Sequence, residues 1–96
     1  MTTYTTTATA TSATGNLITV ASTTNMFLGL PITFSGTEFG GITADYTYYI
    51  LSIDYTNSKI SISPLPAGVA TTLTTATGSM SVNFTSGGQQ IIDRKS

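Results

Sequence analysis

The residues that could do chemistry in this chain are few. Away from the C-terminal end, the only carboxylate and amine side chains are Glu38, Asp45, Asp54 and Lys59. The chain has no His and no Cys, so the commonest general base and the commonest soft metal ligands are missing. A Ser or Thr nucleophile would need a terminal amine or Lys59 as its base, and Lys59 is expected beside a turn as a solvated charge. The sequence therefore predicts a non-enzymatic protein without a cofactor.

Glu38 and Asp45 flank one loop and form the only candidate acid pair. Glycoside hydrolysis needs two carboxylates roughly 5–10 Å apart in a cleft, and a chain of 96 residues offers little cleft. The same pair could bind Ca²⁺ together with loop carbonyls, but no D-x-D-x-D spacing supports this. We therefore interpret both carboxylates as surface charges, predict no metal site, and keep a small hydrolase as the weakest hypothesis.

Aromatic side chains are the better candidates for recognition. Tyr46, Tyr48 and Tyr49 lie close together, and we expect at least one of them to be exposed. An exposed Tyr can anchor a protein or sugar contact, whereas the alternative interpretation is cross-strand aromatic contact within the fold. The candidate interaction surface predicted from the sequence consists of Tyr4, Phe39, Tyr46 and Tyr48.

The elements that would position these residues are strands. Thr and Ser supply 33 of the 96 residues, and the β-branched Thr favours strands. No segment has the apolar spacing of a helix, so essentially no helix is expected. The sequence predicts one all-β domain, a small barrel or sandwich of about five to six mostly antiparallel strands. The expected strands are 17–21, 32–35, 46–54, 59–63 and 80–85, with a loop or weak strand at 67–77.

The hairpin formed by 46–54 and 59–63 is the clearest local unit. A polar turn at 55–58 joins the two strands. In the second strand Ile60 and Ile62 are expected to face the core, with Ser61 and Ser63 on the other side. The expected core consists of Leu17 or Ile18, Val20, Leu28, Ile32, Phe34, Ile50, Ile53, Ile60, Ile62, Met80, Val82 and Phe84.

Residues 1–15 form a Thr-rich segment without a large apolar anchor. It reads either as a disordered terminus or as an extended arm that becomes a strand only on a neighbouring molecule. The expected division is an arm at 1–15, a β domain at 16–86 and a polar tail at 87–96. Deletion of residues 1–14 is accordingly expected to weaken assembly and leave the fold intact. The paired Gly40 and Gly41 are expected to permit positive φ in the loop that contains them.

Charge and hydropathy exclude several classes of partner. The formal net charge is −1 and only 7% of residues are charged, which gives no footprint for nucleic acid. No apolar run approaches the ~20 residues of a membrane span, and the Thr-rich start does not resemble a signal peptide. The chain is expected to be soluble and not classically secreted. Without disulfides, a domain of this size commonly gains stability by oligomerisation.

Four sequence segments carry a resemblance to a known family: 15–20 (GNLITV), 29–37 (GLPITFSGT), 39–42 (FGGI) and 48–50 (YYI). Their order and spacing resemble a β module that recurs in virion structural proteins of tailed bacteriophages, notably marine cyanophages. The resemblance covers about 15–63 and, more loosely, 76–84. The module often occurs as one unit of a long tail or fibre protein, whereas this chain has one copy.

The resemblance implies a structural subunit located in the virion, with no catalytic residues. Its partners would be copies of itself and other virion proteins, as in a capsid decoration or cement protein or a tail-associated protein. The alternative is a receptor- or carbohydrate-binding module of a tail fibre or baseplate, whose partner would be a host receptor or glycan. The resemblance leaves the position in the capsid, tail or fibre open.

Overall fold

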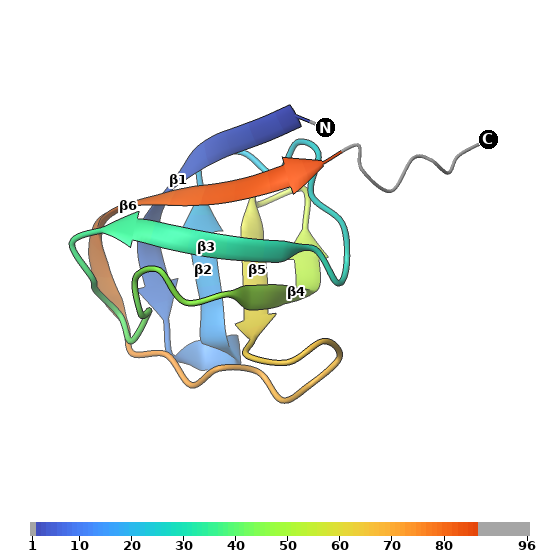
Figure 1. Cartoon of the computed structure of the whole chain (residues 1–96). Helices are drawn as coiled ribbons and strands as arrows, with labels where there is room; N and C mark the ends of the chain where they lie inside the picture. Colours follow the sequence, from blue (N-terminus) through green and yellow to red (C-terminus); the bar gives the residue numbers. More distant parts are fainter. Residues whose placement is uncertain (1, 87–96) are drawn as a thin grey trace.

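The computed structural model describes residues 2–86, which form a closed barrel of six antiparallel strands (Figure 1). Around the barrel the strands follow the order β1-β2-β5-β4-β3-β6. The elements are β1 (Thr2–Ser12), the 3₁₀ turn η1 (Thr14–Asn16), β2 (Leu17–Val20), β3 (Pro31–Gly36), β4 (Tyr48–Asp54), β5 (Lys59–Ser63) and β6 (Ala76–Ser86). The prediction of an all-β, mostly antiparallel domain is confirmed, and the barrel is the form it takes.

The core fills the inside of this barrel. In β3 the residues alternate between buried and more exposed positions, as expected for strands with one face inward. Phe34, Ile60 and Ile62 have no measurable exposure. Most of the expected core is confirmed, but Leu28 is 64% exposed and Ile53 is only partly buried. The core residues that the sequence pattern missed are Ala8, Met26, Leu30, Ile42, Tyr48 and Leu73.

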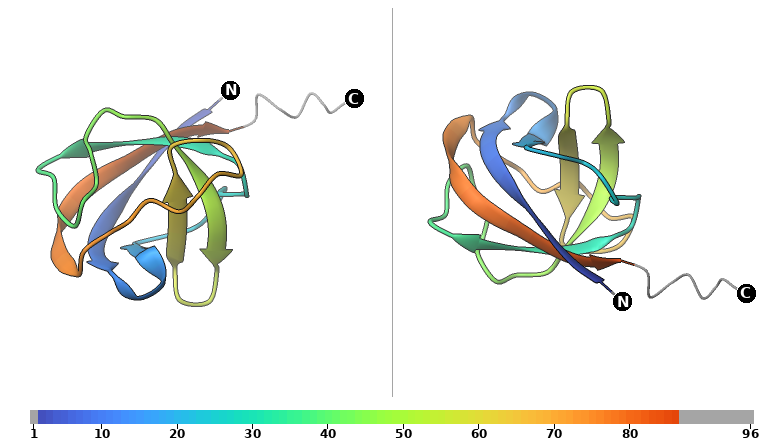
Figure 2. Two further views of the ribbon diagram at one scale, coloured as in Figure 1. Left: turned by 90° about the horizontal axis from the view of Figure 1, so that it is seen from below. Right: turned by 90° about the horizontal axis from the view of Figure 1, so that it is seen from above.

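The expectation of an arm at 1–15 is wrong, because most of this segment is the strand β1. Its N-terminal part pairs with β6 from Thr2 to Ala8, and its C-terminal part pairs with both β2 and β6. Figure 2 shows β1 running along β6 over the length of the barrel. Ala8 is fully buried, so a small side chain anchors the segment where a larger one would not fit. The expected tail at 87–96 lies outside the described residues.

The predicted hairpin of β4 and β5 is confirmed. Ile50 pairs with Ile62 and Ile53 with Ile60, while a register shift between Ile50 and Ser52 leaves one extra residue in β4. Such a bulge bends its strand, which helps a sheet to close into a barrel. The side of β5 opposite Ile60 and Ile62 is covered as well, because Ser63 is fully buried. Thr71 donates its N–H to the Ile62 carbonyl at 2.7 Å, so the loop that follows β5 lies alongside this strand.

Two loops close one end of the barrel. Gly40 and Gly41 have φ values of 68° and 96°, as the sequence led us to expect. The Gly40 carbonyl accepts the N–H of Thr74 at 2.9 Å, which joins the loop after β3 to the loop after β5. Within these loops Ile42 and Leu73 are 2% exposed. We conclude that they seal the apolar interior at this end.

Candidate functional site

The outer face of β1, β6 and β3 is a regular surface of polar side chains. Thr5 of β1 is opposite Asn83 of β6, which in turn is opposite Thr33 of β3. Neighbouring rows continue this pattern, because outward residues recur at every second position of a strand. We name this surface the hydroxyl face and define it by Thr3, Thr5, Thr7, Thr33, Ser35, Ser81, Asn83 and Thr85.

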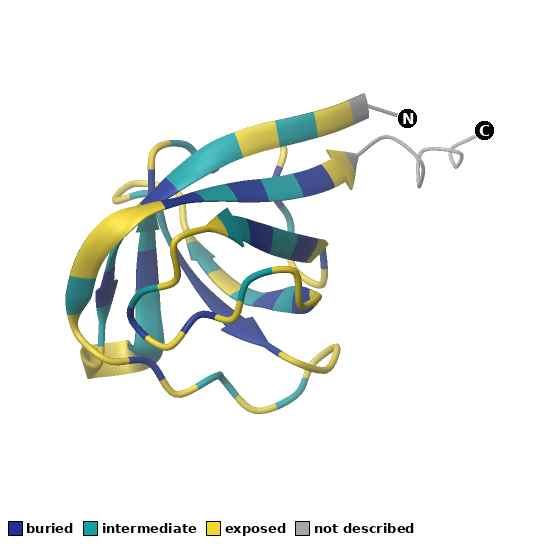
Figure 3. Cartoon of the chain, turned by 60° about the vertical axis from the view of Figure 1, so that its left-hand side comes forward, coloured by how far each residue is buried: buried dark blue, intermediate teal, exposed yellow. Residues whose placement is uncertain are grey.

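Every residue of the hydroxyl face is exposed or half-buried, and Figure 3 shows the alternation of burial along these strands. None of these residues is charged. Asn83 links the three strands through its side-chain amide. Thr5 Oγ1 donates to Asn83 Oδ1 at 3.1 Å, and Asn83 Nδ2 donates to Ser35 Oγ at 3.2 Å. These bonds hold the side chains in a row, and within residues 2–86 the other hydroxyl groups of this face make no side-chain hydrogen bond.

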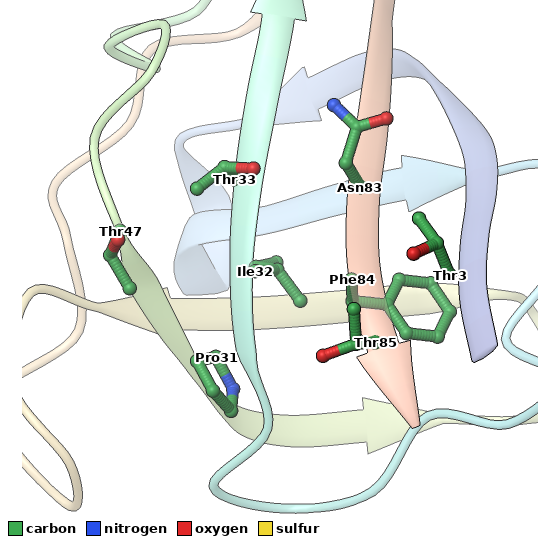
Figure 4. Close-up of a pocket in the computed structure, with 8 residues that line it drawn as sticks. All are labelled: Thr3, Pro31, Ile32, Thr33, Thr47, Asn83, Phe84 and Thr85. Carbon is green, nitrogen blue, oxygen red and sulfur yellow. The ribbon is translucent and has the colours of Figure 1, made fainter. Parts of the chain in front are cut away.

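A cleft of about 260 Å³ opens at one end of the hydroxyl face (Figure 4). The ladder between β3 and β6 ends at the pair of Thr33 and Asn83. The neighbouring Pro31 has no backbone N–H to continue the ladder, and we attribute the opening to this residue. The cleft is lined by Thr3, Pro31, Ile32, Thr33, Thr47, Asn83, Phe84 and Thr85.

The chemistry of the cleft is that of neutral hydrogen bonding. Its polar groups are Thr hydroxyls and the amide of Asn83, which both donate and accept. Ile32, Phe84 and Pro31 supply apolar contact beside them. Because no lining residue is ionisable, the cleft is suited to uncharged polar groups and has no side chain for acid–base catalysis at neutral pH.

Glu38 and Asp45, the candidate acid pair, have structural contacts in their loop. Glu38 Oε2 accepts the backbone N–H of Ala44 at 2.6 Å. Asp45 has a φ of 62°, a left-handed conformation that Asp tolerates better than most residues, and its N–H donates to the Phe34 carbonyl at 2.8 Å. Within residues 2–86 there is no group of three potential metal ligands. The pair therefore gives no support to the hydrolase hypothesis.

Asp54 organises the turn between β4 and β5. Its carboxylate accepts the Asn57 side-chain amide at 2.8 Å and the backbone N–H groups of Asn57 and Thr56 at 3.0 and 3.1 Å. The Asn57 side chain contributes most to holding the pKa of Asp54 below its usual value, with a smaller contribution from the charge of Lys59. These contacts give Asp54 a structural role in the turn of the hairpin, where it pairs with Lys59 across the two strands.

The four aromatic residues of the expected interaction surface do not form one surface. Tyr48 is only 3% exposed, and its hydroxyl accepts the N–H of Thr43 at 2.9 Å. Its assignment to an exposed surface is wrong, because β4 turns it into the barrel against Phe34. Tyr46 is 47% exposed, with its ring centroid 5.0 Å from that of Tyr48. Tyr46 therefore remains the one exposed aromatic group of this cluster.

Tyr4 and Phe39 lie near opposite ends of β6. The half-buried Tyr4 stacks on Phe84, with 5.5 Å between the ring centroids. The half-buried Phe39 ring covers Gly78, where a Cβ would come within 2.6 Å of it. Phe84 lies six positions after Gly78 in the strand, a distance of roughly 20 Å. Both aromatic rings are thus half-buried against the barrel.

The hydroxyl face was missed because β1 was not recognised as a strand. The sequence carried only part of the signal, in Ser81, Asn83 and Thr85, which alternate with apolar residues in the predicted last strand. Thr3, Thr5 and Thr7 stand among further Thr residues and show no such alternation. The two sets face the same side only because β1 and β6 are neighbours, and this pairing joins opposite ends of the described chain.

No helix among the described residues has the length and hydropathy needed to cross a membrane. No protein-family model matches this chain, and neither a curated protein nor a solved structure is significantly similar to it.

Proposed function

We propose that the chain is a non-enzymatic structural subunit of a tailed-phage virion, as a capsid decoration or cement protein or a tail-associated protein. The resemblance of residues 15–63 to the phage β module gives the setting. The observation that carries the role is the hydroxyl face, an ordered and uncharged surface across three strands. The chain then works by contact and performs no reaction.

The chemistry of the hydroxyl face suits a permanent protein contact. Its hydroxyl and amide groups can donate or accept according to the partner, so they can be satisfied without a matching charge. Burying them avoids the high cost of removing an unpaired ion from water. Because this face carries no charge, its binding is expected to depend little on ionic strength.

Binding to purified particles tests this proposal. The purified protein is sedimented with phage particles that lack it, at about 0.05 and about 0.5 M NaCl. We expect saturable binding at both salt concentrations. Thr33→Lys and Ser81→Lys each place a charge on the hydroxyl face and are expected to weaken binding at least tenfold. The matched control Thr56→Lys changes an exposed residue in the hairpin turn and is expected to bind normally. Absence of binding by the unaltered protein would overturn the proposal.

The cleft specifically favours a second candidate, a receptor- or carbohydrate-binding module of a tail fibre or baseplate. Its Thr hydroxyls, its Asn83 amide and its apolar wall match the mixed polar and apolar surface of a neutral sugar. A glycan array is expected to give a signal that Asn83→Ala reduces and Thr56→Ala does not. An array without signal above background, together with particle binding, would leave the structural role alone.

A further inference from the structure

Among the residues that the structure describes, one edge of β1 has no partner strand before Thr7. Among residues 2–86, β2 pairs only with the part of β1 from Ala8 onward, and the last contact is the Ala21 N–H donated to the Thr7 carbonyl at 2.8 Å. In an antiparallel strand the N–H and C=O of one residue point to the same side, and successive residues alternate. The backbone groups of Thr5 and Thr3 therefore point away from β6 to the same side as those of Thr7.

Within the described part of the chain, this free edge carries no charge, proline or bulge that would hinder pairing. Natural edge strands carry Lys, Pro or a bulge that blocks the approach of another strand. The segment from Thr2 to Thr6 consists of four Thr and one Tyr, and the register shift in β1 occurs only after Ala8. The edge is therefore regular, uncharged and composed of residues that favour strands.

We propose that two copies of the chain pair through this edge, antiparallel about a two-fold axis at Tyr4. In this register Thr3 of one copy and Thr5 of the other form a hydrogen-bonded pair, in which each donates its N–H to the carbonyl of the other. Thr5 of the first copy and Thr3 of the second form the same kind of pair. Tyr4 then faces Tyr4 of the second copy in a non-hydrogen-bonded pair, where side chains approach closely. Each Tyr4 ring already stacks on Phe84 at 5.5 Å, so the four rings come together at the junction.

A second copy is the occupant that this edge fits. The uncharged segment from Thr2 to Thr6 can pair antiparallel with the same segment of a second copy without charge repulsion. Both copies present the backbone groups of Thr3 and Thr5 at this edge. Pairing about a two-fold axis uses the same edge of both molecules, so assembly stops at the dimer. Because only four backbone hydrogen bonds are added, the interface is small and the dimer weak, with Kd on the order of 10⁻⁴ M. This inference does not depend on the proposed role in a virion.

Disulfide trapping tests the register directly, because the chain has no Cys of its own. Thr3→Cys and Thr5→Cys both alter exposed side chains. Directly opposite residues have Cα atoms about 5.5 Å apart, within disulfide range. Mixing the two variants under mild oxidation is expected to give a disulfide-linked heterodimer. Either variant alone is expected to give at least tenfold less dimer, because identical positions are then offset by two residues and roughly 8 Å apart.

The control mixture combines Thr9→Cys with Thr56→Cys, two other exposed positions, and is expected to stay monomeric on a non-reducing gel. Equal cross-linking in all mixtures would overturn the proposal, since it would indicate random collision. Efficient linkage of Thr5→Cys to itself would overturn the two-fold axis at Tyr4, and polymers in place of dimers would overturn closure.

A backbone variant provides a second readout. Thr5→Pro removes one N–H that faces the free edge, at an edge position where proline is tolerated. Sedimentation equilibrium is expected to show that Thr5→Pro stays monomeric while Thr5→Ser dimerises like the unaltered chain, with circular dichroism unchanged in both. Dimerisation of folded Thr5→Pro, or a monomeric unaltered chain at millimolar concentration, would overturn the proposal.

Discussion

At the scale of single residues, Gly40 shows how closely a loop packs on the barrel. Its φ of 68° favours glycine, and a Cβ at this position would overlap the side chain of Thr11. Thr11 is 4% exposed, and its hydroxyl donates to the Thr74 carbonyl, so it cannot move aside without losing that bond. The loop after β3, through Gly40, and the loop after β5, through Thr74, thus both contact Thr11 of β1.

Gly40→Ala is expected to lower the free energy of unfolding by at least about 3 kcal/mol, combining backbone strain with steric overlap. Gly29→Ala is the matched control, because Gly29 also has positive φ, at 84°, but has no atom within 4 Å of the Cβ position. Only the conformational cost of about 1 kcal/mol is expected there. Urea denaturation measures both, and equal losses would contradict the contact with Thr11.

Asp54 gives the fold a dependence on pH. Its pKa is lowered in the folded state, chiefly by the hydrogen bond from the Asn57 side chain. The stabilisation is therefore fully present above the unfolded pKa of about 3.9 and is lost as the pH falls through the lower folded value. We expect the urea midpoint to be lower at pH 2 than at pH 6, two values that each lie about two units from that pKa.

Asp54→Asn isolates this contribution because the amide oxygen can still accept backbone N–H groups while the charge is gone. The difference in midpoint between the unaltered chain and Asp54→Asn is expected to shrink as the pH is lowered. The two proteins differ at this residue alone, so the difference in midpoint reports on Asp54. A difference that stays constant across the pH range would show that the charge of Asp54 is not involved.

At the scale of elements, β1 determines whether the sheet can close. It pairs with β2 on one edge and with β6 on the other, and without it both neighbours would expose unpaired edges. Removal of residues 1–12 is therefore expected to unfold the domain, in contrast to the expectation for a dispensable arm. Near-ultraviolet circular dichroism and amide dispersion in NMR spectra measure the loss.

A synthetic peptide of residues 1–14 provides the complementary experiment. If β1 acts only by completing the barrel, the peptide is expected to restore the signal of the truncated chain in a saturable manner. A peptide in which Ala8 is replaced by Leu is expected to fail, because Ala8 is fully buried and leaves no room for a larger side chain. A truncated chain that remains folded without any peptide would contradict the role assigned to β1.

At the scale of the whole molecule, stability depends on side chains that loops contribute to the barrel interior. Leu73 lies in the long loop after β5, yet it is 2% exposed, and its N–H donates to the Asn16 side chain at 3.1 Å. Leu65 in the same loop is 66% exposed. Substituting each of the two leucines therefore distinguishes the effect of a buried loop side chain from that of an exposed one in the same loop.

Leu73→Ala is expected to lower the free energy of unfolding by about 2–5 kcal/mol, the range for buried leucines. Leu65→Ala is expected to change it by less than about 0.5 kcal/mol. Thermal and urea denaturation provide the measurement. A similar effect of the two substitutions would show that the loop does not seal the barrel.

The sequence alone determined the fold class and most strands, because β-branched content and alternation are local properties of the chain. The hairpin of β4 and β5 was predictable for the same reason, since its strands are neighbours in sequence. The positive φ of Gly40 and Gly41 also follows from residue type.

The tertiary structure decided what depends on distant segments. Thr2–Ser12 carries no large apolar anchor, so only its pairing with β6, from the other end of the described chain, identifies it as a barrel strand. The same pairing assembles the hydroxyl face. On the other edge of β1, the short β2 pairs only from Ala8 onward, so within residues 2–86 the edge at Thr3 and Thr5 has no partner strand. Tyr48 was expected on the surface and is buried, whereas Leu28 was expected in the core and is exposed. Burial depends on which segments cover a side chain, and no local pattern contains that information.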